Sequence, residues 1–247
     1  MPIFIISLLI QVALVVHIVR TGRNTTWIWI VVMLPLAGSL AYFIVELLPG
    51  LMDSRSGRKM RRNLGDAINP NKDINEAHFN YTVSDNIENS IQLANECLNK
   101  GMYEDAKQLC VKCLRGVHEH DPYVMHCLAR AEFGLRNFSE VKSVLDTLIV
   151  HNPEFKNADA HLLYARSLEE LNETKAALEE YEALEAYYPG PEATYRYGKL
   201  LKSVGEHEKA NSFFEKIIHS SKISGRHYNS LHKEWIALAK NEKGAWE

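Results

Sequence analysis

The sequence lacks the motifs of common enzymes. No glycine-rich phosphate loop, nucleophile elbow or paired-carboxylate motif occurs in its 247 residues, which argues against P-loop nucleotide binding and against triad hydrolysis. The net charge of −3, with no long basic run in the C-terminal part, argues against nucleic acid as a partner. We therefore expect no enzyme activity, no cofactor and no small-molecule substrate.

Cysteine is also scarce, with four residues in the chain. Cys110 and Cys113 have the spacing of a metal or redox pair, but a zinc site would need a second ligand pair. In the repeats described below their positions hold large apolar residues, so we interpret both as core residues. His118 and His120 could bind a metal, but their place between two helix pairs favours a polar turn. We expect no metal site.

Charge is absent from the first nineteen residues, and Glu46 is the only charged residue from Trp27 to Leu48. About 20 apolar residues span a bilayer core, so residues 3–19 and 27–48 are predicted to be two transmembrane helices within an anchor of residues 1–52. A secretory signal peptide is the alternative for the first run, but it would need a basic start and a cleavage site of small residues.

A basic collar follows the anchor. It holds five basic residues and one acid, and the basic residues are Arg55, Arg58, Lys59, Arg61 and Arg62. By the positive-inside rule this cluster outweighs the two arginines of the turn after the first run. It predicts an integral plasma (inner) membrane protein with its C-terminal body in the cytoplasm, and it could also bind anionic lipid headgroups. Residues 53–86 show no sustained apolar period and are predicted to be a linker.

The second apolar run resembles a known module. Trp27, Pro35, Gly38 and Tyr42 are similarly arranged in the two-helix N-terminal domain of cardiolipin synthases and related phospholipase D-type proteins. That resemblance would imply phospholipid synthesis if the family's catalytic His-x-Lys-x-x-x-x-Asp signature occurred twice. The only His-x-Lys is His207-Glu-Lys209, and Phe214 stands where the aspartate should follow. The resemblance therefore supports the anchor and not the enzyme.

The rest of the chain contains an internal repeat. Anchor positions recur with separations of 35, 36 and 33 residues, at Ala106, Val141, Ala177 and Ala210. A small residue stands twelve places before each anchor, at Ala94, Ala129, Ala165 and Gly198. Small residues at this offset let two antiparallel helices approach closely, and the bulky residues after each anchor fill the space towards the next pair.

This pattern resembles the tetratricopeptide repeat (TPR) family, whose unit is a helix-turn-helix of about 34 residues. The family's aromatic residue near the start of the first helix is missing here. The prediction is an all-α chain, with a transmembrane hairpin followed by an α-solenoid of about four helix pairs over residues 87–224. A capping helix and tail follow over residues 225–247, with Leu231, Trp235, Leu238 and Ala239 on its packed face.

In TPR arrays the first helices of successive pairs line a concave groove. The residue after each small residue and the residue four places before it tend to point into this groove. With Lys202 added, the predicted partner groove consists of Asn95, His126, Arg130, Arg166, Tyr195, Lys199 and Lys202. Such a row suits an extended peptide with carboxylates. The alternative is that Arg130 and Arg166 pair with Glu132, Glu169 or Glu170.

Together these features predict a membrane-anchored scaffold that holds a protein or peptide partner at the membrane. The alternative function is an accessory or regulatory subunit of an enzyme of phospholipid synthesis or envelope assembly.

Overall fold

The computed structural model describes residues 2–22, 24–47, 49 and 69–244. The chain divides into two compact units, Met1–Lys72 and Asp73–Glu247, and each is described by itself. The basic residues of the collar, Arg55 to Arg62, lie outside the described residues.

The N-terminal unit consists of α1 (Pro2–Thr21), α2 (Thr26–Met33), α3 (Pro35–Tyr42) and a π-helical turn over Phe43–Leu47. Sequence analysis predicted a transmembrane helix over residues 27–48, and the structure divides this run into two α-helices and the π-helical turn. The chain breaks at Leu34, with φ −123° and ψ 79°, because a residue before proline is disfavoured in the helical region. Across the described part of the chain, none of the helices is both long enough and apolar enough to cross a membrane.

A small apolar core joins the helices of this unit. Ile18, Val31 and Tyr42 are buried, and Gly38 lies so close to the preceding helix that a Cβ there would be 2.2 Å from the carbonyl oxygen of Ile30. Only glycine allows this approach of α3 to α2.

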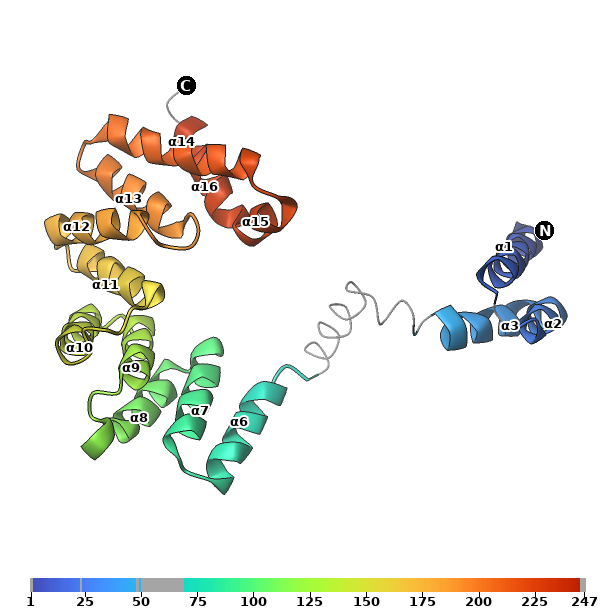
Figure 1. Cartoon of the computed structure of the whole chain (residues 1–247), viewed down its shortest axis with the longest axis horizontal. Coiled ribbons are helices and arrows are strands. Elements are labelled where there is room, and N and C mark those ends of the chain that lie inside the picture. The colour runs from blue at the N-terminus through green and yellow to red at the C-terminus, as the bar shows by residue number, and fades with distance from the viewer. Residues whose placement is uncertain (1, 23, 48, 50–68, 245–247) are drawn as a thin grey trace. The chain divides into compact units, whose positions relative to one another are not determined.

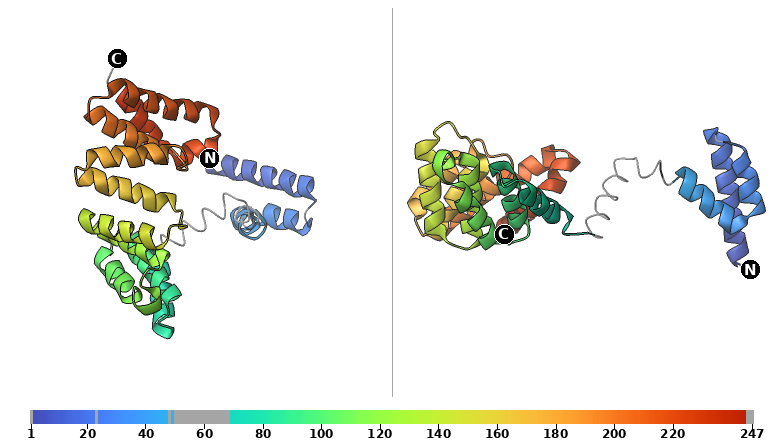
Figure 2. Two further views of the ribbon diagram at one scale, coloured as in Figure 1. Left: turned by 60° about the vertical axis from the view of Figure 1, so that its left-hand side comes forward. Right: turned by 90° about the horizontal axis from the view of Figure 1, so that it is seen from below.

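The second unit, which we call the array, is a stack of antiparallel helix pairs (Figures 1 and 2). The pairs are α7 (Ile87–Asn99) with α8 (Tyr103–Cys113), α9 (Pro122–Gly134) with α10 (Phe138–His151), α11 (Ala158–Glu170) with α12 (Thr174–Glu185), and α13 (Glu192–Ser203) with α14 (His207–Ile223). In Figure 1 the array curves, and α10 and α12 lie on its outer side while α9, α11 and α13 lie towards its inner side.

The small residues of the repeat are buried where the two helices of a pair meet. Ala129 and Ala165 have no exposed surface, and the anchors Val141 and Ala177 have none either. At Gly198, a Cβ would lie 2.9 Å from the ring of Phe214. The predicted repeat is therefore the packing unit of the array.

Each turn within a helix pair has the same backbone conformation. The residues at these turns, separated by 35, 36 and 33 positions, have positive φ and are Gly101, Arg136, Asn172 and Gly205. In the second pair the amide of Asn137 donates to the carbonyl of Glu132 at 2.9 Å, and the other three turns contain the equivalent bond. This is the Schellman ending of a helix, which glycine satisfies without strain and arginine does not.

Two elements at the ends of the array differ from the prediction. Helix α6 (Lys72–Val83) lies within the predicted linker of residues 53–86. Ile74, Ala77 and Tyr81 form one helical stripe, and they pack on the core of the first pair. Three apolar residues were too few to give a periodic signal in a polar segment.

At the C-terminal end, the single predicted helix is divided into α15 (Arg226–Leu231) and α16 (Lys233–Gly244). The buried residues of α16 are Ile236 and Ala239, whereas Leu231 is 68% exposed. The prediction of Leu231 on the packed face is therefore wrong, because the break at His232 takes Leu231 out of the register of α16. Helix α16 packs mainly on α14 and touches α13.

Candidate functional site

The candidate groove is built from the inner helices α7, α9, α11 and α13. Asn95 and Arg130 occupy equivalent places one repeat apart, and Arg130 Nη1 donates a hydrogen bond to Asn95 Oδ1 at 2.7 Å. Asn95 is itself fixed, because its Nδ2 donates to the carbonyl of Ile91 at 3.0 Å. The guanidinium of Arg130 is thus held in place by a neutral hydrogen-bond partner.

Arg166 is the most constrained cation of the row. Its guanidinium carbon lies 4.4 Å from the ring centroid of Phe133, and its nearest carboxylate, Glu192, is 4.0 Å away. The Arg166 Nε atom is buried and has no hydrogen-bond partner among the described residues. Burial and then the neighbouring Arg196 lower the pKa of Arg166, opposed by Glu192. A buried guanidinium with an unused donor favours a further anion.

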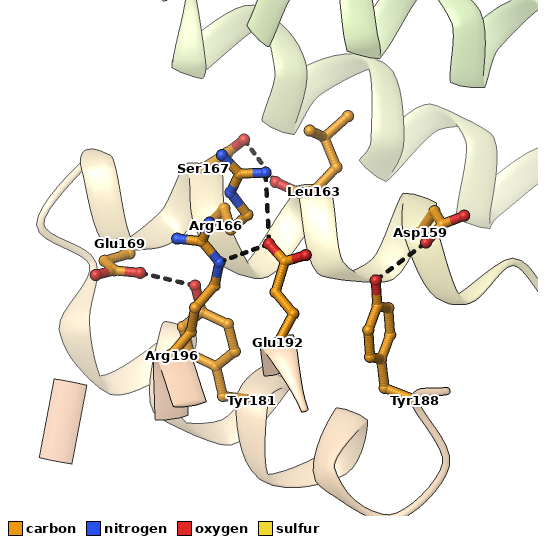
Figure 3. A network of polar contacts seen from close by, with 9 residues as sticks. All are labelled: Asp159, Leu163, Arg166, Ser167, Glu169, Tyr181, Tyr188, Glu192 and Arg196. Carbon is orange, nitrogen blue, oxygen red and sulfur yellow. Dashed lines mark hydrogen bonds and ion pairs between the residues drawn. The ribbon is translucent and has the colours of Figure 1, made fainter. Parts of the chain in front are cut away.

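Glu192 is shared between two arginines, as Figure 3 shows. Arg196, one turn further along α13, donates from Nε to Glu192 Oε1 at 2.9 Å. Glu192 is therefore closer to Arg196 than to Arg166. Beside this network Tyr181 donates to Glu169 at 2.7 Å, and burial followed by the charge of Glu169 raises the pKa of Tyr181. Glu169 is therefore engaged as an acceptor of the phenol.

His126 lies on α9, one turn before Arg130, and is half-buried. Burial first and the charge of Arg130 second lower the pKa of His126, while Asp159 of α11 acts in the opposite sense. The imidazole is therefore held neutral in a cationic surrounding, and an anion placed beside it would favour its protonation.

The C-terminal end of the predicted row is covered by α16. Tyr195 is 6% exposed and packs against Phe214 and Trp235. Lys202 Nζ contacts Glu242 Oε2 at 2.7 Å, so its charge is paired within the chain. Lys199 is exposed. The structure thus brings Asn95 and Arg130 together, places Arg166 beside the next helix, and turns Tyr195 and Lys202 towards the capping helix.

The alternative pairing of the two arginines is not what the structure shows. The partners of Arg130 and Arg166 are Asn95 and Glu192, whereas Glu132 contacts Lys107 at 3.0 Å and Glu170 contacts Arg136 at 3.8 Å.

Phe133 and Glu192 were missed as groove residues. Phe133 stands four places after Ala129, as Lys202 does after Gly198, so the same spacing could have found it. Glu192 could not be found this way, because its role depends on the distance between α11 and α13.

The cysteines and histidines considered for metal binding are placed elsewhere. Cys110 and Cys127 are buried in one core cluster. The thiol of Cys110 hydrogen-bonds Cys127, and this bond and then burial raise the pKa of Cys110. The ring of His120 stacks on His151 at a centroid distance of 3.6 Å. In the part of the chain that is described, no group of three or more metal-ligating side chains is arranged around a common centre.

The N-terminal unit contains polar contacts of its own. Gln11 Nε2 donates to the carbonyl of Val31 at 2.8 Å, and this is the carbonyl whose usual donor would be the amide of Pro35, which proline lacks. The ring of His17 hydrogen-bonds the Tyr42 hydroxyl at 3.0 Å. Each contact joins α1 to the helices that follow it.

The comparisons with known proteins agree with this two-part structure. The Phospholipase D-nuclease N-terminal family matches residues 9–46, and no curated protein matches the chain. A thermophilic TPR protein of Thermus thermophilus superposes with a TM-score of 0.54 at 16% identity, covering 70% of this chain and 88% of that one.

A second solved structure, YrrB, is described as a TPR protein with an unusual peptide-binding site. It superposes with a TM-score of 0.53 at 19% identity, covering 74% of this chain and 88% of its own. The array therefore has the TPR fold. Residues 9–46 are similar to the phospholipase D-nuclease N-terminal domain.

Proposed function

We propose that the chain is a membrane-anchored scaffold whose groove binds a protein or peptide with carboxylate side chains. The observation that carries this proposal is Arg166, a half-buried cation with an unused donor, a ring beneath it and a carboxylate only at 4.0 Å. Evolved sites rarely bury a guanidinium without full hydrogen bonding. The Arg166 side chain is 29% exposed, and a ligand carboxylate would bind to this exposed part of the cation.

The binding step needs no bond chemistry. Arg130 is already oriented by Asn95, so little side-chain entropy is lost when it meets an anion. A peptide lying along α7, α9 and α11 would find cations on α9 and α11, with Phe133 and His126 offering contact area between them. The C-terminal part of the row contributes less, because Lys202 is already paired with Glu242.

Membrane anchoring by two spans is the second part of the proposal. Its support is the match of residues 9–46 to the phospholipase D-nuclease N-terminal family and the exposure of large apolar side chains, such as Leu9, Val19 and Trp29. In water this surface would be costly. Lipid would cover it, and the basic collar would then keep the array in the cytoplasm, where the partner is concentrated near the membrane.

The decisive experiment is affinity capture from membranes with the full chain. We expect a variant with Arg130, Arg166 and Lys199 changed to Glu to lose the partner that the unchanged chain retains. A matched variant with Lys175, Lys209 and Lys222 changed to Glu alters charge equally at exposed positions of the outer helices α12 and α14 and should retain it. An unchanged set of captured proteins in the groove variant would refute the groove proposal.

The orientation is tested separately. A reporter that is active only in the cytoplasm, fused after Glu247, should be active. A reporter active only on the opposite side of the membrane should stay silent, and the reverse result would overturn the topology while leaving the groove proposal intact.

The second candidate function is an accessory subunit of a phospholipid-synthesis or envelope-assembly enzyme. The match of residues 9–46 to a domain named for phospholipase D enzymes favours it. Capture of lipid-synthesis enzymes that requires residues 1–52, and that survives the groove variant, would support this function over the scaffold.

A further inference from the structure

A cavity lies away from the groove, between α10, α11 and α12. Its volume is about 630 Å³, and the loop of residues 152–157 closes one side. Leu145, Leu148, Ile149, Phe155 and Tyr164 supply most of its apolar wall. This size falls within the range of about 300–1,000 Å³ that is usual for sites that hold a compact ligand or a large side chain.

The cavity occurs at a repeat position that is filled differently in each pair. The equivalent residues, separated by 35, 36 and 33 positions, are Ser90, Met125, His161 and Thr194. Met125 is 4% exposed and packs in the core. In the third pair the position holds His161, whose ring makes two polar contacts. Its Nε2 contacts Glu180 Oε2 at 2.6 Å, and its Nδ1 contacts the Tyr187 hydroxyl. The imidazole is thus tethered to α12, and space remains beside it.

The cavity and the groove lie on different sides of α11. His161 and Arg166 are five residues apart, and at about 100° per residue this separates them by roughly 140° around the helix axis. Next to the cavity the outer surface exposes apolar side chains, including Ile149, Val150 and Tyr187. An apolar hollow flanked by exposed apolar residues is typical of a site that a partner side chain enters.

The charges around the cavity favour a cationic partner. The carboxylate of Glu180 lines it, and Asp146 accepts a hydrogen bond from the wall residue Tyr164 at 2.7 Å. Glu154, in the closing loop, is exposed. The wall itself holds one carboxylate, Glu180, and one lysine, Lys156, so the negative balance of this region comes from Asp146 and Glu154 beside the cavity.

We infer that this cavity is a second binding site, which takes an aromatic side chain flanked by arginine or lysine from a protein partner. The ring enters between Leu148, Ile149 and Tyr164, and the neighbouring cation meets Glu180. The site goes beyond the proposed groove function. It would let one array hold two partners of opposite charge, an acidic one on its inner face and a basic one on its outer face.

The test uses the full chain in maltoside micelles and two fluorescein-labelled peptides, Gly-Arg-Trp-Arg-Gly and Gly-Arg-Ala-Arg-Gly, followed by anisotropy. The tryptophan peptide should bind at least about tenfold more tightly, because a buried aromatic anchor carries most of such an interface. Equal affinity of the two peptides for the unchanged chain would overturn the inference.

Variants locate the site. His161→Trp and Ile149→Trp fill the cavity and should each weaken binding by about tenfold, while circular dichroism and the melting temperature show that the array stays folded. Glu180→Gln should weaken binding several-fold and reduce its salt dependence. Glu208→Gln, at an exposed position of α14, is the matched control and should change nothing.

A groove variant separates this site from the first. Arg166→Glu should leave affinity for the tryptophan peptide unchanged. If Arg166→Glu abolishes binding, or if both folded cavity-filling variants bind as the unchanged chain does, the peptide lies elsewhere and the inference is wrong.

Discussion

In the N-terminal unit large apolar side chains such as Leu9 and Trp29 face outwards, whereas in the array residues such as Tyr181 and Phe214 are fully buried. Polar groups show the reverse arrangement. Gln11 and His17 bind partners inside the N-terminal unit, while several ion pairs of the array, such as Lys112 with Asp85, have both side chains exposed. The two units therefore expose different kinds of side chain, and in both of them small residues allow helices to pack closely.

The largest effect is expected from the array core. Phe214→Ala removes a ring that has no exposed surface and should lower the free energy of unfolding of the array by about 3–5 kcal/mol, because a cavity remains. Urea titration followed by circular dichroism measures this. The matched change Leu9→Ala, at a side chain that is 64% exposed, should leave the titration unaltered. An equal loss in both variants would break the comparison.

A smaller effect is expected inside the N-terminal unit. Gly38→Ala places a Cβ 2.2 Å from the carbonyl oxygen of Ile30, and relieving this overlap should cost about 1–3 kcal/mol of local stability. Hydrogen exchange of residues 26–42 in micelles should accelerate. Ala37→Ser, at the exposed neighbouring position, provides the control. Exchange as slow as in the unchanged chain would show that α2 and α3 are not closely packed.

A stabilising change is available within the array. Arg136 has φ +63° at a turn where the first and last pairs have glycine, and Arg136→Gly should raise stability by about 1 kcal/mol by relieving left-handed strain. Part of the gain is offset because the exposed contact with Glu170 is lost. Thermal melting measures the change, and Gly101→Arg should produce the opposite shift. A lower melting temperature for Arg136→Gly would contradict the strain argument.

The smallest effect is a pH dependence that arises from His126. Its pKa is lowered in the folded array from the ordinary value of 6.5, so the unfolded chain binds the proton more readily. Stability from this group is complete above that value and decreases as the pH falls through the folded pKa.

Urea midpoints between pH 7.5 and 5.5 should therefore decrease less for His126→Gln than for the unchanged chain. His219→Gln, at an exposed position of α14, is the matched control. Identical slopes for His126→Gln and the unchanged chain would show that the imidazole is not held neutral.

The sequence predicted the array better than its ends. Ala129, Val141 and their equivalents recur regularly because each repeat meets the same packing requirement, so about four helix pairs could be predicted over residues 87–224. Helix α6 has one apolar stripe of three residues, and the break at Leu34 depends on a single proline that membrane helices often tolerate.

The site was less predictable than the fold. Spacing could place Arg130 and Arg166 on the inner helices, but it could not show that Asn95 binds one of them or that Glu192 turns towards Arg196. The cover of Tyr195 and Lys202 by α16 depends on the angle at His232. The outer cavity depends on the contacts of His161 with Glu180 and Tyr187. These partners are 19 and 26 positions away in the sequence.

Helices α6 and α16 cover the two ends of the array, and this bears on how copies of the chain can associate. An uncovered end would present the apolar face of one repeat to the opposite end of another copy, and such head-to-tail contacts grow into filaments. With both ends covered, a higher protein concentration does not lengthen the array. The length of the array is therefore fixed by the number of encoded repeats, and any clustering would have to occur side by side.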